Sequence, residues 1–355
     1  MSLFRSAHSG AGNWRLAVDE CAGRIGAARG LGFVYFSDAL SPAADSIVRA
    51  LRERTGVQQW IGTVGIGVLA SGVEYYEEPA MSVMVADLDP ASFQVFSGRS
   101  RPRGDAHFAV VHGDPETPEM PGLIADMSTK VASGFLVGGL SSSRSRSVQV
   151  ANDVISGGLS GAVFGAEVAV STRLTQGCSP LQGRYRVTEC DENVLVTLDG
   201  RPALDVFMEA IGEVLSRDLR RAAHFVHVGL PVKGSDRADY LVRNLVGIDA
   251  KQKLLAIGDV VEPGDEVIFC KRDGESARQD LGRILGELKA AVPAPRGALY
   301  YSCLGRGEHM FGRRGAELEQ VRAALGDVPL AGFFCNGEIS HDRLYGYTGV
   351  LTLFH

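Results

Sequence analysis

Two short segments near the C-terminal end carry polar side chains that could bind a small molecule. SCLGRGE places Cys303 and Arg306 after an apolar run, and FFCNGEI places Cys335, Asn336 and Glu338 after another. A guanidinium can fork onto a carboxylate, and carboxylate and amide oxygens accept hydrogen bonds from an ammonium. If the two runs are neighbouring strands, both polar groups emerge at one edge of a sheet, where ligand crevices of α/β proteins lie. The pattern predicts a site for a zwitterion.

Glycines next to short apolar runs extend this prediction. Gly337 lies inside the second polar segment, and Gly62 and Gly138 follow similar runs earlier in the chain. Glycine in a strand lets the backbone approach a ligand or another chain closely, so we include all three among the predicted ligand-binding residues. Two structural alternatives without a ligand stay open. The glycines could serve only tight turns, and Arg306 and Glu338 could form a structural ion pair.

The same segments raise the alternative of thiol catalysis. His309 and His341 each follow a cysteine, Cys303 or Cys335, by six residues. A nucleophilic thiol needs a base within hydrogen-bond distance, whereas a buried free cysteine is the more common outcome. The sequence therefore favours a protein without catalysis, with a thiol-dependent hydrolase or transferase as an alternative.

No metal or cofactor is predicted. The eight histidines form no HxH or HExxH pattern, and the six cysteines form no CxxC pair. The glycine-rich stretches GIGVLASG and LGRGEHMFGRRG match neither the dinucleotide-binding fingerprint nor the P-loop.

Composition excludes several classes of partner. The chain has 355 residues, 45% hydrophobic and 22% charged, which is ordinary for a soluble globular protein of about two domains. A formal charge of −6 gives no basic field for nucleic acid or an anionic membrane. No apolar run reaches the roughly 18 residues of a transmembrane helix, and no export signal is visible. With scattered cysteines, these features indicate a cytoplasmic protein with reduced thiols.

A repeated order of elements must position the polar segments. Residues 33–36 form a short buried strand, and Ser41 with Pro42 predicts the start of a helix that ends at Gly56. A second strand opens at Trp60 and runs into a glycine-rich stretch.

The same order returns near the C-terminal end. A strand at 297–303 precedes a helical stripe of Leu318, Val321 and Leu325. Strands at 329–339 and 347–354 follow it. A looser third copy has strands at 106–113, 133–140 and 160–170, with a helix at 119–131 between the first two.

These β-α-β-β units predict a mixed α/β fold. Repeated units with this many strands per helix imply mixed sheets that pack together with helices outside. Turns and strands at 176–207 bridge the two halves, with a boundary near residue 203. We therefore predict a helical lead-in at 1–30, an N-terminal module at 31–202 and a C-terminal module at 203–355.

The motifs resemble those of FIST domains. GALYYSCLGRG, VPLAGFFCNGEIS and LYGYTGVLTLF are similar to the FIST C-terminal module. GFVYFSD, WIGTVGIGVLASGV, FLVGGL and the segment from QGCSPLQGRYRV to DGRPALDVF are similar to its N-terminal module. The resemblance implies an intracellular sensory module for a small ligand, with an amino acid as the suggested ligand.

Two departures from the family pattern bear on function. Positions 65 and 67 are glycine, where the N-terminal motif often carries the Gly-Glu pair found here at Gly337–Glu338, so a site in the first copy is expected to be weaker. No signalling output segment is recognisable, so a sensor of this kind would signal through a partner protein. A protein-interaction scaffold without a ligand is the other non-enzymatic alternative.

Overall fold

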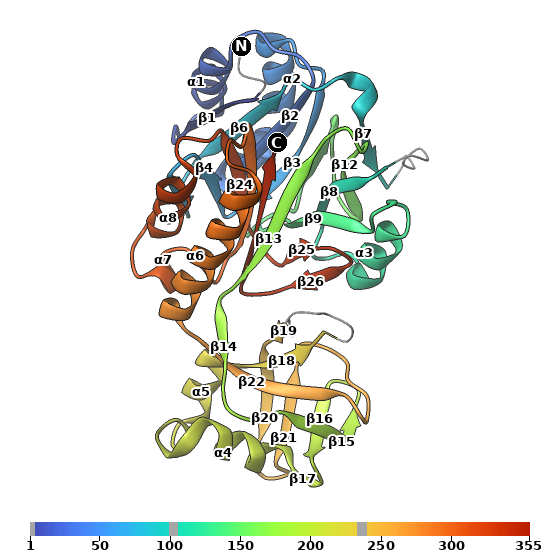
Figure 1. Ribbon diagram of the computed structural model, residues 1–355, viewed down its shortest axis with the longest axis vertical. Coiled ribbons are helices and arrows are strands. Elements are labelled where there is room, and N and C mark those ends of the chain that lie inside the picture. Colours follow the sequence, from blue (N-terminus) through green and yellow to red (C-terminus); the bar gives the residue numbers. More distant parts are fainter. Residues whose placement is uncertain (1–3, 99–105, 233–239) are drawn as a thin grey trace. The chain divides into compact units, whose positions relative to one another are not determined.

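The computed structural model describes residues 4–98, 106–232 and 240–355 (Figure 1). Its architecture is mixed α/β, with four sheets and helices on their outer faces. The predicted fold class is therefore confirmed.

The chain forms two compact units that differ from the predicted modules. The first unit comprises Met1–Thr175 together with Arg278–His355, and the second comprises Gln176–Ala277. The predicted boundary near residue 203 lies inside the second unit. The C-terminal segment returns to the first unit because its strands pair with strands from the beginning of the chain.

The first unit contains three six-stranded sheets. The first sheet has the spatial order β1 (Phe4–Ser9), β6 (Met81–Ala86), β2 (Leu31–Ser37), β3 (Gln59–Gly65), β10 (Gln149–Ala151), β11 (Asp153–Ile155). The second has the order β7 (Phe93–Ser97), β12 (Leu159–Phe164), β8 (Phe108–Gly113), β9 (Phe135–Leu140), β25 (Glu338–Ser340), β26 (Arg343–Tyr345). The third has the order β13 (Val170–Gln176), β27 (Thr348–Phe354), β23 (Gly297–Cys303), β24 (Leu330–Cys335), β4 (Gly67–Ala70), β5 (Val73–Tyr76).

All three sheets are built in the same way. Each contains a parallel pair joined by a crossover helix: β2–β3 with α2 (Ala44–Thr55), β8–β9 with α3 (Met120–Ser128), and β23–β24 with α8 (Ala316–Leu325). Beside each pair lies a hairpin that belongs to a different β-α-β-β unit. The hairpins that begin with β10, β25 and β4 pair with β3, β9 and β24 respectively.

Alternation along the strands divides the interior into layers. Phe33 and Tyr35 of β2 point into a core shared by all three sheets, whereas Val34 and Phe36 pack against helices α1 (Trp14–Ile25) and α2. Strands buried on both faces are expected to be continuously apolar. This explains why β2 shows no polar alternation although its two faces contact different layers.

Three glycines allow the parallel pairs to form. A Cβ atom at Gly62, Gly138 or Gly332 would lie only 1.7, 1.7 or 1.8 Å from a carbonyl oxygen on the paired strand. Gly62 and Gly138 were predicted to approach a ligand. In the structure, the close approach that they permit is to a neighbouring strand, and a ligand contact at either glycine stays a prediction.

The second unit has its own core. A nine-stranded sheet contains β14 (Cys178–Pro180), β15 (Tyr185–Asp191), β16 (Val194–Leu198), β17 (Arg201–Pro202), β18 (Val226–Pro231), β19 (Tyr240–Arg243), β20 (Leu245–Asp249), β21 (Leu254–Ile257) and β22 (Glu266–Arg272). Helices α4 (Ala203–Ser216) and α5 (Leu219–Phe225) contribute to the same core. The predicted turns at 191–193 and 199–200 are present, with left-handed backbone at Glu192 and Asp199.

Most predicted elements are found, with two local corrections. The predicted strand at 297–303 matches β23, and Gly56 and Gly326 end their helices as expected. Ser41 does not cap α2, because a 3-10 helix (Asp38–Ala43) precedes it. The lead-in predicted as helical also contains β1, which pairs with β6. The remaining helices are η2 (Pro90–Ser92), α6 (Gly274–Ala291) and α7 (Glu308–Phe311).

The contact at Gly332 predicts a large effect of a single methyl group. Gly332→Ala should destabilise the protein by about 3 kcal/mol or more, because the new Cβ meets backbone that cannot move aside. Gly23→Ala, on the exposed face of α1 with open space around it, should be neutral or stabilising by up to about 1 kcal/mol. Urea unfolding of both variants tests this; equal stabilities would contradict the structural role of Gly332.

Candidate functional site

The structure brings part of the predicted site together. Cys303 and Cys335 lie opposite each other at the ends of the parallel strands β23 and β24. Glu338, the first residue of β25, is fully buried beside them, with its Oε1 atom 3.3 Å from the Cys335 Sγ atom. Thr348 donates to the other oxygen of Glu338 from its backbone nitrogen (3.1 Å) and its hydroxyl (2.7 Å).

Arg306 has a buried carboxylate partner that the sequence analysis did not consider. Its Nε atom donates to Glu317 Oε1 at 2.8 Å, and its Nη2 atom lies 2.7 Å from the same oxygen, with both side chains fully buried. Neither Nη1 nor Nη2 makes a well-directed hydrogen bond with any described residue. The sequence analysis left open an ion pair of Arg306 with Glu338, whereas the structure pairs Arg306 with Glu317. Removing one partner of such a buried pair typically costs about 3–5 kcal/mol.

Glu317 is the centre of a polar network around that guanidinium. It accepts hydrogen bonds from the hydroxyls of Tyr300 and Ser302 and, at 3.2 Å, from the backbone nitrogen of Gly307. Glu74 of β5 accepts from backbone nitrogens at the start of α8. Burial and the neighbouring Glu317 raise the pKa of Glu74 to about 7. A carboxylate of the hairpin from the first half of the chain thus caps a helix of the second half.

Asn336 and Gly337 contribute backbone contacts. The Asn336 side chain is exposed, while its backbone nitrogen donates to Leu140 O at 3.1 Å. The Gly337 carbonyl accepts from Leu140 N at 2.9 Å, which joins β9 to the chain after β24. Both residues therefore hold the turn between β24 and β25 against the second sheet.

The thiols do not have the surroundings of a nucleophile. Burial raises the pKa of both Cys303 and Cys335, and the nearby Glu338 raises it further. His309 packs edge-on against Tyr76, and His341 contacts Phe135. No described histidine contact activates either cysteine, so the geometry does not support the thiol-dependent enzyme.

A buried polar cluster at the meeting of the three sheets was not predicted. The Tyr35 hydroxyl lies 2.9 Å from the Tyr301 hydroxyl and 3.2 Å from His112 Nε2. These three residues occupy equivalent positions on β2, β23 and β8. Each directly follows the strand residue opposite a close-approach glycine. Burial lowers the pKa of His112 to about 3, so the imidazole is neutral.

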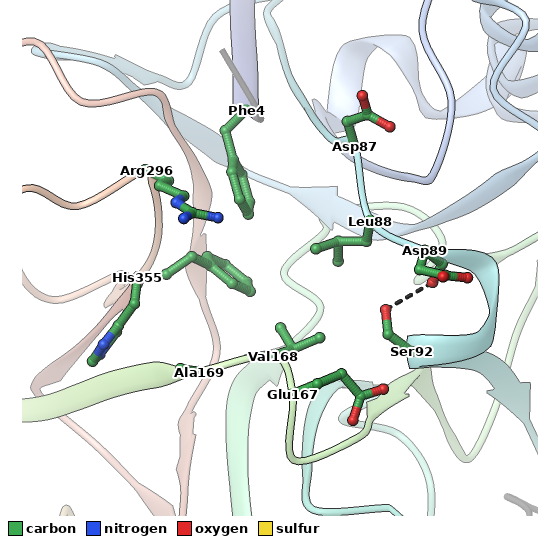
Figure 2. Close-up of a pocket in the computed structure, with 11 residues that line it drawn as sticks. Phe4, Asp87, Leu88, Asp89, Ser92, Glu167, Val168, Ala169, Arg296 and His355 are labelled. Carbon is green, nitrogen blue, oxygen red and sulfur yellow. Dashed lines mark hydrogen bonds between the residues drawn. The ribbon is translucent and has the colours of Figure 1, made fainter. Parts of the chain in front are cut away.

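A pocket lies at the other end of the three sheets. Its volume is about 250 Å³, and residues from the ends of β6, β12 and β27 line it. Its floor is apolar, formed by Phe4, Leu88, Val168 and Phe354 (Figure 2). Arg296, also in the lining, directly precedes β23, whereas Cys303 ends it. The pocket and the predicted site are therefore separated by the length of that strand, about 20 Å.

Charged side chains surround the apolar floor of the pocket. Arg296 lies on one side and Asp89 and Glu167 lie on the other (Figure 2). Asp87 also lines the pocket but pairs with Arg29, 2.8 Å from its Nε atom. The pocket can therefore accept a ligand with an apolar part and charged groups of both signs.

Comparison with known protein families shows to which family the chain belongs. The FIST N domain matches residues 30–201, and the FIST C domain matches residues 203–341. The chain belongs to the FIST family. The resemblance inferred from the sequence motifs is thereby confirmed.

Two relatives of this FIST protein come from mycobacteria. An uncharacterized protein of Mycobacterium tuberculosis (strain ATCC 25618 / H37Rv) is 32% identical over 322 residues, covering 83% of each chain. An uncharacterized protein of Mycobacterium bovis (strain ATCC BAA-935 / AF2122/97) is 29% identical over 365 residues, covering 95% of this chain and 93% of the relative. The similarity therefore extends beyond either FIST domain alone.

Family membership supports a sensory role in general terms. FIST domains are regarded as sensory domains, which suggests small-ligand binding and signalling. No helix among the described residues is long and apolar enough to cross a membrane. Within the same residues, no group of three or more His, Cys, Asp or Glu side chains could hold a metal ion.

Sequence reasoning missed the pocket residues of the FIST protein because they come from separate segments. Arg296, Asp89 and Glu167 were given no role. A signal was nevertheless present. VADLD, VFGAE and LTLFH each start near the end of the last strand of one repeated unit, which is β6, β12 or β27. Aligning these three ends would have brought the segments together.

The burial of Glu338 predicts a pH-dependent stability. Burial raises its pKa from 4.5 to about 7, so the folded protein holds the proton more tightly than the unfolded chain. The free energy of unfolding should fall as pH rises from about 4.5 to about 7. Glu338→Gln should make this fall smaller by about 3 kcal/mol, as measured by urea unfolding at several pH values. Glu53→Gln, at an exposed position of α2, is the control. An unchanged profile in Glu338→Gln would show that burial does not perturb this carboxyl.

The raised thiol pKa values predict slow alkylation. At pH 7, iodoacetamide should label Cys303 and Cys335 at least about tenfold more slowly in the folded protein than in urea. Mass spectrometry of the labelled peptides measures both rates. Labelling of either folded thiol at the unfolded rate would restore the nucleophile hypothesis.

Proposed function

We propose that this FIST protein is a sensory module that binds a small ligand without chemical change and signals through a partner protein. One observation carries the proposal: an apolar-floored pocket with charges of both signs at the junction of three sheets. Pockets of this kind, mostly apolar with a few polar groups that fix orientation, are typical of small-molecule sites.

The position of the pocket suits a sensor. Its lining comes from the first sheet through Phe4, from the β6–β7 and β12–β13 connections, and from the third sheet through Phe354. A ligand that contacts all of these segments favours whichever arrangement of them binds it best. Such differential affinity is the requirement for a ligand to shift a conformational equilibrium.

Amino acids, with their charges on one carbon atom or at the two ends of a longer chain, are the first ligand class to test. Their ammonium and carboxylate are complementary in charge to the side chains around the pocket. The predicted site at Arg306 and Glu338 is the second candidate location, since the buried Nη1 atom of Arg306 retains hydrogen-bonding capacity. Both of those side chains are fully buried, so a ligand could reach them only after a local rearrangement.

Exposed apolar side chains support the proposal that a partner protein binds. Six large hydrophobic side chains are exposed among the described residues, and four of them belong to the second unit. They are Val214, Phe225, Val246 and Val260. We take these side chains as the candidate contacts for a partner protein; a contiguous apolar patch is the usual mark of such a surface. The same observation supports the alternative of a scaffold without a ligand. The cytoplasmic location stays a prediction.

A thermal-shift screen with a blocking variant tests the sensory function. Amino acids, organic acids and nucleotides are the probes, and a ligand at 100 times its Kd should stabilise the protein by about 2.7 kcal/mol. Ala169 lines the pocket and is exposed, so Ala169→Trp should fill the pocket without disturbing the core. This variant should keep the melting temperature of the free protein and lose the response to the ligand.

Ala132→Trp is the matched control, because Ala132 is also exposed and lies outside the pocket. It should retain the full ligand response. A screen in which no compound raises the melting temperature would contradict the sensory function. The protein-interaction scaffold without a ligand would then be the remaining non-enzymatic function. A thermal-shift response that persists in Ala169→Trp would show that the ligand binds outside the pocket.

A further inference from the structure

The two sides of the pocket carry exposed charged side chains of opposite sign. The Arg296 guanidinium makes no hydrogen bond or ion pair with any residue that the structure describes, and the same is true of the Glu167 carboxylate. Asp89 uses its Oδ1 atom to accept from Ala91 N at 2.9 Å, which leaves Oδ2 available. Lone charged groups of this kind around a cavity are available to a ligand.

The apolar floor separates these charges. Figure 2 shows Leu88 and Val168 between Arg296 and the two carboxylates, and Phe354 also lines the pocket. The rings of Phe4 and Phe354 are 4.9 Å apart, and both belong to the common core. A ligand that reaches both sides must therefore lay an uncharged stretch across this floor.

This arrangement discriminates among small molecules. A simple carboxylic acid would bind Arg296 but face the carboxylates of Asp89 and Glu167, and a simple amine would leave Arg296 unpaired. An α-amino acid carries both charges on one carbon atom, so it could satisfy only one side. A molecule with its two charges at opposite ends of an apolar chain satisfies both.

We propose that the pocket binds a small zwitterion whose carboxylate and ammonium are separated by an apolar chain, as in an ω-amino acid or a short peptide. The carboxylate binds Arg296 in a forked hydrogen bond, the ammonium binds Glu167 and Asp89, and the chain lies on Leu88, Val168 and Phe354. This inference rests on the proposed function and refines its ligand class.

The volume of the pocket agrees with a ligand of this size. At about 250 Å³ the pocket is smaller than the roughly 300–1,000 Å³ usual for sites of drug-sized molecules. An aliphatic chain of a few carbon atoms with two charged ends fits this volume.

Two isomers provide the test. 6-Aminohexanoate and norleucine have the same atoms, but the charges are separated in the first and adjacent in the second. Isothermal titration calorimetry with the full chain should give a Kd for 6-aminohexanoate at least about tenfold lower than for norleucine, since one lost charge contact corresponds to about that factor. Pentylamine and hexanoate, each with one charged end, should also bind at least about tenfold more weakly.

Substitutions on both sides assign the charges. Arg296→Gln and Glu167→Gln should each weaken 6-aminohexanoate binding at least about tenfold. Arg296→Gln should not weaken pentylamine binding, and Glu167→Gln should not weaken hexanoate binding, because each variant removes only a charge of the same sign as that probe. Arg49→Gln and Glu53→Gln, at exposed positions of α2 outside the pocket, should retain the affinity of the natural protein.

The outcomes separate this inference from the sensory function. Equal or tighter binding of norleucine, or unchanged affinity in both pocket variants, would overturn the charge-separated ligand. If another compound from the screen still lost its response in Ala169→Trp, the sensory function would stand without this ligand class. If no compound bound, both proposals would fail together.

Discussion

Burial of one face of each of three sheets in a common core is the constraint on which the first unit depends. Because helices cover the other faces, the central strands are buried on both sides, and their backbone groups must find partners within the sheets. The edge beside each second parallel strand is filled by a hairpin from a different β-α-β-β unit. The units therefore cannot complete their sheets separately, and residues from both ends of the sequence fold as one body. This interdependence explains why the compact units cut across the sequence modules.

The polar groups of this body gather toward one end of its strands. Tyr35, Tyr301 and His112 meet within the core, and Glu338 and Glu317 lie where β24 and β23 end. In such surroundings the uncharged forms are favoured, which explains the neutral His112 and the raised pKa of Glu338. A charge survives burial only with a partner, as Glu317 is for Arg306. This end of the molecule holds the three sheets together by hydrogen bonds, with no surface-open cavity among the described pockets.

The opposite end of the three sheets carries an open pocket. There β6, β12 and β27 finish, the side chains of the core become the floor of a pocket, and loops supply the charged groups. Rigid strands that present variable loop residues are a common basis for binding sites. The family relationship supports a sensory role in general terms, and this pocket is the location that we propose for it. The separation of Arg296 from Glu167 and Asp89 is the basis of the proposed ligand shape.

The sequence by itself determined the local elements and their order. The apolar runs predicted β2, β23 and β24, glycine predicted the ends of α2 and α8, and the family motifs predicted the FIST relationship. These features depend on periodicity and turn chemistry, which neighbouring residues encode. The partner of Arg306, the exchange of hairpins among sheets and the pocket around Arg296 depended on the tertiary structure. Each joins residues far apart in the chain or on different elements, and packing decides which of many compatible side chains meet. Local patterns place a charged residue at a strand end, but only the folded chain determines what lies opposite it.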